Sequence, residues 1–135
     1  MVNKNFIAII QARYNSSRLP GKVCKKIIKN FSVIETIILR LKKSKKIDQI
    51  VLSTSSNIND KKIIQICKRL KIKFFIGSEN DVLDRFYKTA LKFKADNIVR
   101  ITSDCPLVDP LLIDDFIKKF LEKKPDYLSN AIAFF

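Results

Sequence analysis

The chain has 135 residues, of which 47% are hydrophobic, and no apolar run approaches the roughly 18 residues that a membrane-spanning helix needs. This length allows one domain with a buried core, and residues 1–5 lack the cleavage pattern of a signal peptide. We expect a cytoplasmic location because an apolar span and a signal-peptide pattern are both missing. The three cysteines are scattered and there is no histidine, which argues against a zinc site or a disulfide framework.

The net charge of +14 leaves two interpretations open. A strongly basic chain attracts polyanions, so a nucleic-acid-binding domain is one of them. However, lysines occur in nearly every predicted helix, and no segment interleaves them with exposed aromatic residues as single-strand binders do. We therefore favour lysine-rich solvated surfaces, with no specific nucleic-acid partner and no membrane partner.

The first predicted strand covers residues 5–12, an apolar run typical of a strand that is buried on both faces. An irregular passage over 23–29 follows the next loop. Ser32 and Glu35 then form the pattern of a capping box at the start of a helix. Apolar residues at 34, 37, 38 and 41 give this helix one buried face.

Strands and helices alternate along the rest of the chain. Further strands are predicted over 49–54, 73–76, 97–101 and 126–130, and further helices from 61 to about 70, over 82–93, and from Pro110 with Asp109 as its cap. Asn80 or Asp81 is expected to cap the helix over 82–93. The predicted inner face of that helix consists of Leu83, Phe86, Tyr87, Ala90, Leu91 and Phe93.

This alternation predicts an α/β fold with three layers, αβα, around a mainly parallel sheet. Residues 1–135 would form a single domain without a linker or repeat. Because crossovers between parallel strands are right-handed, the loops that follow the strands should meet at one edge of the sheet. These loops are 13–22, 55–60, 77–81 and 102–109.

The first of these loops carries the residues that best fit a phosphate-binding function. Arg13, Arg18 and Lys22 place three positive charges within ten residues, and guanidinium groups chelate phosphate oxygens in pairs. Ser16 and Ser17 add hydroxyl groups for the same oxygens. The loop suits a triphosphate, although it lacks the glycine spacing of a P-loop, and an ordinary basic surface loop remains the alternative.

Two further segments are candidates. Asp104 follows the fourth strand, where a single carboxylate can hold Mg²⁺ if phosphate oxygens and water supply the other ligands, or can simply cap a turn. Asp81 and Arg85 lie at the start of the helix over 82–93, either beside a ligand or as part of a capped amphipathic helix.

These segments also resemble a known family. Residues 9–22, Ile-Ile-Gln-Ala-Arg-x-x-Ser-Ser-Arg-Leu-Pro-Gly-Lys, are similar to the signature of the sugar cytidylyltransferases, in the branch of spore coat polysaccharide biosynthesis protein F. The 3-deoxy-manno-octulosonate and acylneuraminate cytidylyltransferases are related to that branch. Asp-Val-Leu-x-Arg at 81–85 and Asp-x-Pro at 104–106 resemble further family motifs, in family order.

The resemblance implies the nucleotide-diphospho-sugar transferase fold, which is a Rossmann-like fold also called GT-A. It implies an enzyme that transfers CMP from CTP to a sugar or sugar acid, releases pyrophosphate and serves surface polysaccharide biosynthesis, with a homodimer among its possible assemblies. The residues that match the family's nucleotide contacts are Ala12, Arg13, Ser16, Ser17, Arg18, Lys22, Asp81 and Arg85, with Arg18 and Lys22 in the catalytic role and Asp104 on Mg²⁺.

Relatives in this family are longer, so the resemblance also implies that the fold is incomplete at its C-terminus. The alternative to an enzyme is then a truncated, non-catalytic module that binds nucleotide or completes its site with a partner chain.

Overall fold

Four parallel strands form the centre of this computed structural model, which describes residues 4–131. They are β1 (Phe6–Gln11), β4 (Gln49–Ser55), β5 (Lys73–Gly77) and β6 (Asn97–Thr102). The strands lie in the order β5, β4, β1, β6, so the first strand of the chain lies between two later ones. Ile10 of β1 is level with Leu52 of β4 on one side and with Ile101 of β6 on the other.

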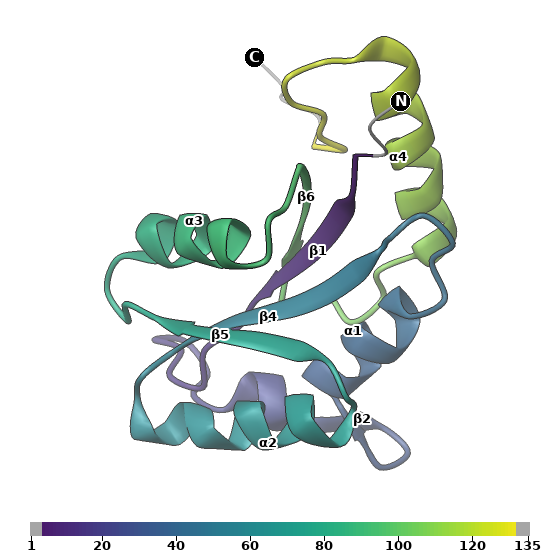
Figure 1. Cartoon of the computed structure of the whole chain (residues 1–135). Helices are drawn as coiled ribbons and strands as arrows, with labels where there is room; N and C mark the ends of the chain where they lie inside the picture. Colours follow the sequence, from purple (N-terminus) through teal and green to yellow (C-terminus); the bar gives the residue numbers. More distant parts are fainter. Residues whose placement is uncertain (1–3, 132–135) are drawn as a thin grey trace.

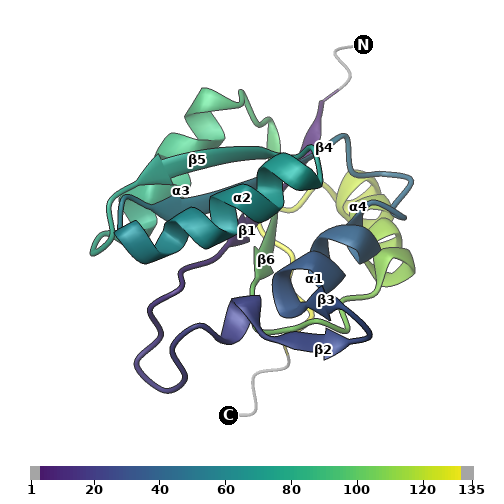
Figure 2. The same cartoon turned by 90° about the horizontal axis from the view of Figure 1, so that it is seen from below.

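Helices cover both faces of the sheet (Figures 1 and 2). They are α1 (Val33–Leu41), α2 (Lys61–Arg69), α3 (Val82–Lys92) and α4 (Pro110–Lys123). Side chains of α1, α2 and α4 pack into the larger apolar core together with Ala8 and Ile10 of β1. On the opposite face, α3 packs over Ile7, Ile9 and Val51. The predicted αβα arrangement around a mainly parallel sheet is therefore confirmed.

The boundaries of the four predicted strands that form the sheet, and the predicted caps of α1, α3 and α4, agree closely with the structure. Ser32 and Glu35 form the capping box of α1: the Ser32 N–H donates to Glu35 Oε2 at 2.7 Å, and the Glu35 N–H donates to Ser32 Oγ at 3.3 Å. Asp81, rather than Asn80, caps α3 by accepting from the Asp84 N–H. Asp109 caps α4 ahead of Pro110, as predicted.

The passage over 23–29 is more regular than predicted. A 3-10 turn covers Lys22–Cys24, and a small antiparallel ribbon joins β2 (Lys26–Ile28) to β3 (Phe31–Ser32). Lys29 adopts a left-handed conformation with φ 52, which allows the tight reversal between these two strands. A lysine at that position gives no glycine signal in the sequence, so the ribbon was not predictable from turn residues.

The predicted inner face of α3 is partly wrong. Leu83 is 80% exposed, and Tyr87 and Leu91 also point to solvent, whereas Arg85 and Thr89 are fully buried. The helix is rotated because Arg85 reaches the backbone of the preceding loop, donating from Nη1 to the carbonyl of Ser78. Phe86, Ala90 and Phe93 do pack on the core as predicted.

The predicted fifth strand over 126–130 is also wrong. This segment has no strand conformation and its residues are exposed or nearly so, with Tyr127 80% exposed. A strand forms only when a neighbour pairs with its backbone, and β6 leaves this segment unpaired. In the described part of the chain, every helix is too short or too polar to cross a membrane.

Candidate functional site

Hydrogen bonds join three of the loops at the carboxyl edge of the sheet. Arg13 follows β1 and donates from Nη1 to the carbonyl of Glu79, which follows β5, at 3.1 Å. The Tyr14 N–H donates to Asp60 Oδ1, beyond β4, at 2.7 Å. Asn57 Nδ2 donates to the carboxylate of Glu79 at 3.0 Å. The predicted convergence of these loops is therefore confirmed.

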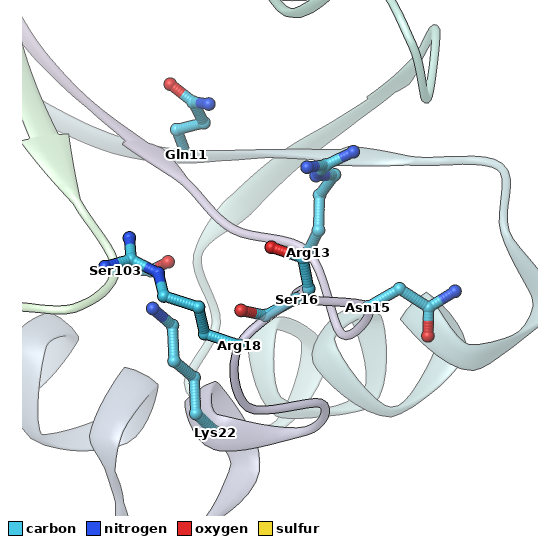
Figure 3. A pocket seen from close by; sticks show the side chains of 8 residues that line it. Gln11, Arg13, Asn15, Ser16, Arg18, Lys22 and Ser103 are labelled. Carbon is cyan, nitrogen blue, oxygen red and sulfur yellow. The ribbon is translucent and has the colours of Figure 1, made fainter.

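The loop between β1 and α1 surrounds an open hollow of about 230 Å³, which we call the first hollow. In Figure 3 the side chains of Arg18 and Lys22 point toward Ser103, which belongs to the loop after β6. The hollow is lined by Gln11, Arg13, Asn15, Ser16, Ser17, Arg18, Lys22 and Ser103. None of these described residues carries a carboxylate, so the lining presents three cations and several hydroxyl and amide groups that suit a multiply charged anion.

Gly21 closes the loop that carries these cations. Its N–H donates to the carbonyl of Tyr14 at 2.7 Å, and its φ of 73 is a left-handed conformation that favours glycine. A Cβ at this position would lie 2.9 Å from the Tyr14 ring, closer than such contacts allow. This closed loop fixes the backbone positions of Arg18 and Lys22, which lie on either side of the turn.

A second hollow of about 180 Å³ adjoins the first, and we call it the second hollow. The two share three lining residues, Gln11, Lys22 and Ser103. The second hollow adds Arg100, Thr102 and Asp104. Lys22 and Asp104, which come from the first and last of the predicted loops, therefore line the same hollow.

Asp104 is an exposed carboxylate whose pKa is lowered from its usual value. The main cause is a hydrogen bond from the Thr102 side chain, which favours the ionised form. Partial burial opposes this effect, while the backbone N–H of Asp104 and, to a smaller extent, the positive charges of Lys22 and Arg18 lower the pKa further. Asp104 is thus an ionised oxygen ligand beside two cations.

The structure separates the predicted site residues into two groups. Five of them line the first hollow and Asp104 lines the second, as described above. Ala12 is buried and lines neither hollow, and its N–H donates to the Ser53 carbonyl at 3.1 Å. Asp81 is the exposed cap of α3. Arg85 is fully buried, and burial lowers its pKa from the usual value, as does the nearby charge of Arg13.

Sequence reasoning missed Asp60 and five residues that line the hollows, which are Gln11, Asn15, Arg100, Thr102 and Ser103. Asp60 looks like the cap of α2, but its carboxylate makes no capping bond and instead accepts from Tyr14, Thr54 and Ser55. The signal for this role is the run of hydroxyl residues that ends β4, since buried hydroxyls need an acceptor. Among these lining residues, Gln11 and Arg100 each carry a long polar side chain that follows apolar residues of its strand.

Comparison with known protein families identifies the group to which this arrangement belongs. The family described as "Cytidylyltransferase" matches residues 7–133, which is nearly the whole chain. The chain belongs to the cytidylyltransferase family. This result confirms the resemblance that the motifs at 9–22, 81–85 and 104–106 suggest.

Two curated relatives of this cytidylyltransferase chain are considerably longer than the chain itself. The chain is 44% identical to uncharacterized protein MJ1063 of Methanocaldococcus jannaschii, over 92% of this chain and 51% of that protein. It is 36% identical to the spore coat polysaccharide biosynthesis protein SpsF of Bacillus subtilis, over 91% of this chain and 52% of SpsF. The chain therefore spans about half the length of the curated relatives that it matches.

Solved structures give the same family and fold. A cytidylyltransferase from Leptospira borgpetersenii serovar Hardjo-bovis matches with a TM-score of 0.86 and 34% identity, over 90% of this chain and 51% of that one. The CMP:2-keto-3-deoxy-manno-octonic acid synthetase, solved in complex with CTP, matches with a TM-score of 0.78 and 20% identity, over 90% and 49%. At that identity the second match supports the Rossmann-like nucleotidyltransferase fold alone.

Proposed function

We propose that this chain is the nucleotide-binding half of an enzyme that transfers CMP from CTP to a sugar or sugar acid in the synthesis of surface polysaccharide precursors. One observation carries the proposal: cations from the loop after β1 and a carboxylate from the loop after β6 line one continuous pair of hollows. Membership of the cytidylyltransferase family supports the choice of CTP. We propose a cytoplasmic location for this reaction.

The triphosphate lies in the first hollow in this proposal. Arg13, Arg18 and Lys22 bind its oxygens, and Ser16 and Ser17 donate hydrogen bonds to them. An acceptor hydroxyl attacks the α-phosphorus, the bond from that phosphorus to the bridging oxygen breaks, pyrophosphate leaves, and the hydroxyl proton passes to solvent. Catalysis here consists mainly of positioning and charge neutralisation, with Arg18 and Lys22 stabilising the charge that develops on the leaving group.

Asp104 suits one ligand position of a Mg²⁺ ion. Its carboxylate is exposed, and its lowered pKa keeps it ionised. The described residues contain no group of three or more acidic, histidine or cysteine side chains that would hold a metal unaided. The site therefore fits an ion that completes its oxygen shell with phosphate oxygens and water. When bound, Mg²⁺ would supply neutralisation of phosphate charge beside Lys22.

The remaining predicted contacts, Ala12, Asp81 and Arg85, line neither hollow. We propose that the backbone of Ala12 adjoins the base, offering its carbonyl because its N–H is already bonded. Asp81 and Arg85 shape the loop between β5 and α3. Arg85 achieves this by donating to backbone carbonyls of that loop, one of which, at Glu79, also accepts from Arg13.

A thermal-shift series tests the nucleotide site. The chain is heated with CTP, UTP, dTTP, ATP or GTP, each with and without Mg²⁺, and CTP with Mg²⁺ is expected to raise the melting temperature most. Ligand at a hundred times its dissociation constant adds about 2.7 kcal/mol to the free energy of unfolding. Lys22→Ala should reduce the CTP response in both conditions, and Asp104→Asn should remove mainly its Mg²⁺ dependence.

Lys118→Ala is the matched control, because this exposed lysine of α4 lines neither hollow. It should respond to CTP as the parent chain does. If Lys22→Ala and Asp104→Asn also respond like the parent, the assignment of these residues is wrong. A response to all five nucleotides alike would contradict the choice of CTP.

One observation favours a second candidate, a nucleotide-binding module without turnover: among the described residues that line the two hollows, the one carboxylate is assigned to Mg²⁺ in this proposal, so none is left as a general base. Pyrophosphate release from CTP across a panel of neutral and acidic sugars separates the two candidates. Release with any sugar supports the enzyme. Nucleotide binding without release from any of them supports the module.

A further inference from the structure

The ribbon of β2 and β3 carries apolar side chains that stay open to solvent. All residues of the segment 25–31 are exposed, and its three large apolar residues, Ile27, Ile28 and Phe31, are 46%, 45% and 42% exposed. The two strands pair only with each other, and the ribbon lies beside α1 at the rim of the molecule (Figures 1 and 2). We call these three apolar residues the ribbon patch.

The pairing of the two strands brings the ribbon patch together. Ile28 and Phe31 lie opposite each other across the ribbon, so their side chains share one face. The register shifts between Lys26 and Ile28, where Ile27 is the additional residue. A ribbon of two short strands buries little apolar surface by itself, so the patch is covered only when another surface meets it.

The chain around the ribbon patch is cationic. Residues 1–34 contain lysine and arginine but no aspartate or glutamate, and Lys25, Lys26 and Lys29 belong to the exposed segment itself. These lysines take part in neither ion pair of the described residues. The first carboxylate of the sequence, Glu35, is buried and paired with Arg69. The ribbon therefore presents apolar and positively charged groups side by side.

We propose that the ribbon binds the surface of an anionic phospholipid bilayer. The shared face of Ile28 and Phe31 reaches the boundary between headgroups and acyl chains, while the lysine side chains extend along the apolar surface to the lipid phosphates. The contact is peripheral, since no helix of residues 4–131 is long and apolar enough to cross a membrane. The sequence alone favours no membrane partner, because it does not show that the apolar residues of this segment stay exposed.

The composition of the ribbon favours a bilayer over a protein or a nucleic acid. Lysine is depleted at the centre of protein interfaces, whereas here lysines alternate with the apolar residues. Nucleic-acid bases stack on aromatic rings, and two of the three patch residues, Ile27 and Ile28, have no ring. The interface of a bilayer accepts both aliphatic side chains and lysines at close range.

Vesicle flotation measures this binding. The parent chain should float with vesicles made of equal parts of phosphatidylglycerol and phosphatidylcholine, and not with phosphatidylcholine alone. A triple variant with Lys25→Gln, Lys26→Gln and Lys29→Gln should bind the mixed vesicles about a hundredfold more weakly, since each lysine near an anionic surface contributes about 1 kcal/mol. Ile28→Ser with Phe31→Ser should also weaken binding, because it removes the inserted face.

A matched control removes the same charge from another part of the surface. Lys118→Gln, Lys119→Gln and Lys123→Gln change three exposed lysines of α4. This variant has the same net charge as the triple variant of the ribbon. It should bind the mixed vesicles as the parent chain does.

Fluorescence identifies the part of the chain that enters the lipid. The chain contains no tryptophan, so a single introduced tryptophan reports its own surroundings. The emission of Phe31→Trp should shift to shorter wavelength with the mixed vesicles, and lipids brominated on the acyl chain should quench it. Tyr87→Trp, at an exposed position of α3, should show neither effect. The circular dichroism spectrum of each variant checks its fold.

The outcomes decide the inference without any nucleotide, so they are independent of the proposed function. Flotation with the mixed vesicles that depends on the ribbon lysines, together with quenching of Phe31→Trp, supports it. It is overturned if the parent chain does not float, if the two lysine variants lose binding equally, or if Tyr87→Trp responds as Phe31→Trp does. If vesicles leave the emission of Phe31→Trp unchanged and poly(U) RNA shifts it, the partner is a nucleic acid and the inference is wrong.

Discussion

Asp60 is a buried carboxylate, 1% exposed, that holds the start of the cation-bearing loop against the end of β4. It accepts from the Tyr14 N–H at 2.7 Å, from the Thr54 hydroxyl at 2.9 Å and from the Ser55 N–H at 3.1 Å. A buried charge is tolerated only when several donors surround it. The shape of the first hollow therefore depends on a residue that does not line it.

Asp60→Asn should destabilise the chain by about 2–3 kcal/mol. The NH₂ group of the new amide would face the donors of Tyr14, Thr54 and Ser55, which need an acceptor. Urea unfolding measures this change. Asp84→Asn is the control, since Asp84 makes a surface ion pair with solvent-exposed Lys88, and the loss of such a pair should change the urea midpoint little. Equal losses in the two variants would contradict the anchoring role of Asp60.

Helices α1 and α3 show which parts of an element the sequence can predict. The apolar positions of α1 are spaced for one face and its ends carry a capping box, so local chemistry and packing agree. In α3, apolar residues occur on more than one face, and the spacing alone does not select the buried one. The choice depends on Arg85, whose backbone partners lie in a loop that the spacing does not describe.

The orientation of α3 predicts that substitutions on its exposed side change the stability little, whereas those on its core side lower it. Leu83→Gln and Leu91→Gln should each change the free energy of unfolding by less than about 0.5 kcal/mol, because both side chains are exposed. Phe86→Ala, on the core side, should cost about 2 kcal/mol or more. Urea midpoints of the three variants measure the difference. A large loss for Leu83→Gln would show that the helix is turned the other way.

At the scale of the whole molecule, acid should destabilise the fold. Burial alone would raise the pKa of Glu35, but hydrogen bonds from Ser32 and the charge of Arg69 lower it overall. Asp114 is similar: burial opposes, and bonds from Ser44 and from the Lys45 and Lys46 backbone lower its pKa. A carboxyl whose pKa is lowered by folding stabilises the fold above its unfolded pKa, and this contribution is lost as the pH falls through the folded pKa.

The free energy of unfolding should therefore be constant from pH 7 to about pH 5 and should fall as the pH drops below the ordinary values of 4.5 for glutamate and 3.8 for aspartate. Protonation of all 13 carboxylates would also raise the net charge from +14 toward +27, which adds self-repulsion. Urea midpoints at pH 7, 5 and 3 measure the loss. Glu35→Gln should make the urea midpoint depend less on pH. A midpoint that rises on acidification would contradict the role given to these carboxylates.

General rules of chain topology predicted most of the architecture. Alternating strands and helices imply parallel strands, and parallel strands place their following loops at one edge, where Arg13, Tyr14 and Asn57 make contacts between loops. Those rules do not specify which side chains line each hollow. Lys22, Arg100 and Asp104 come together from two distant segments, so the second hollow becomes visible only in three dimensions.

The place of Lys22 in both hollows has a consequence for the order of events. In the proposed function, one ammonium group adjoins both the triphosphate and any ligand of the second hollow, so each of the two would change the free energy of binding of the other by the same amount. An anion that reaches the second hollow first would occupy this cation and compete with the incoming triphosphate. The nucleotide would then have to bind before any such anion, and an excess of the anion would lower the apparent affinity for CTP.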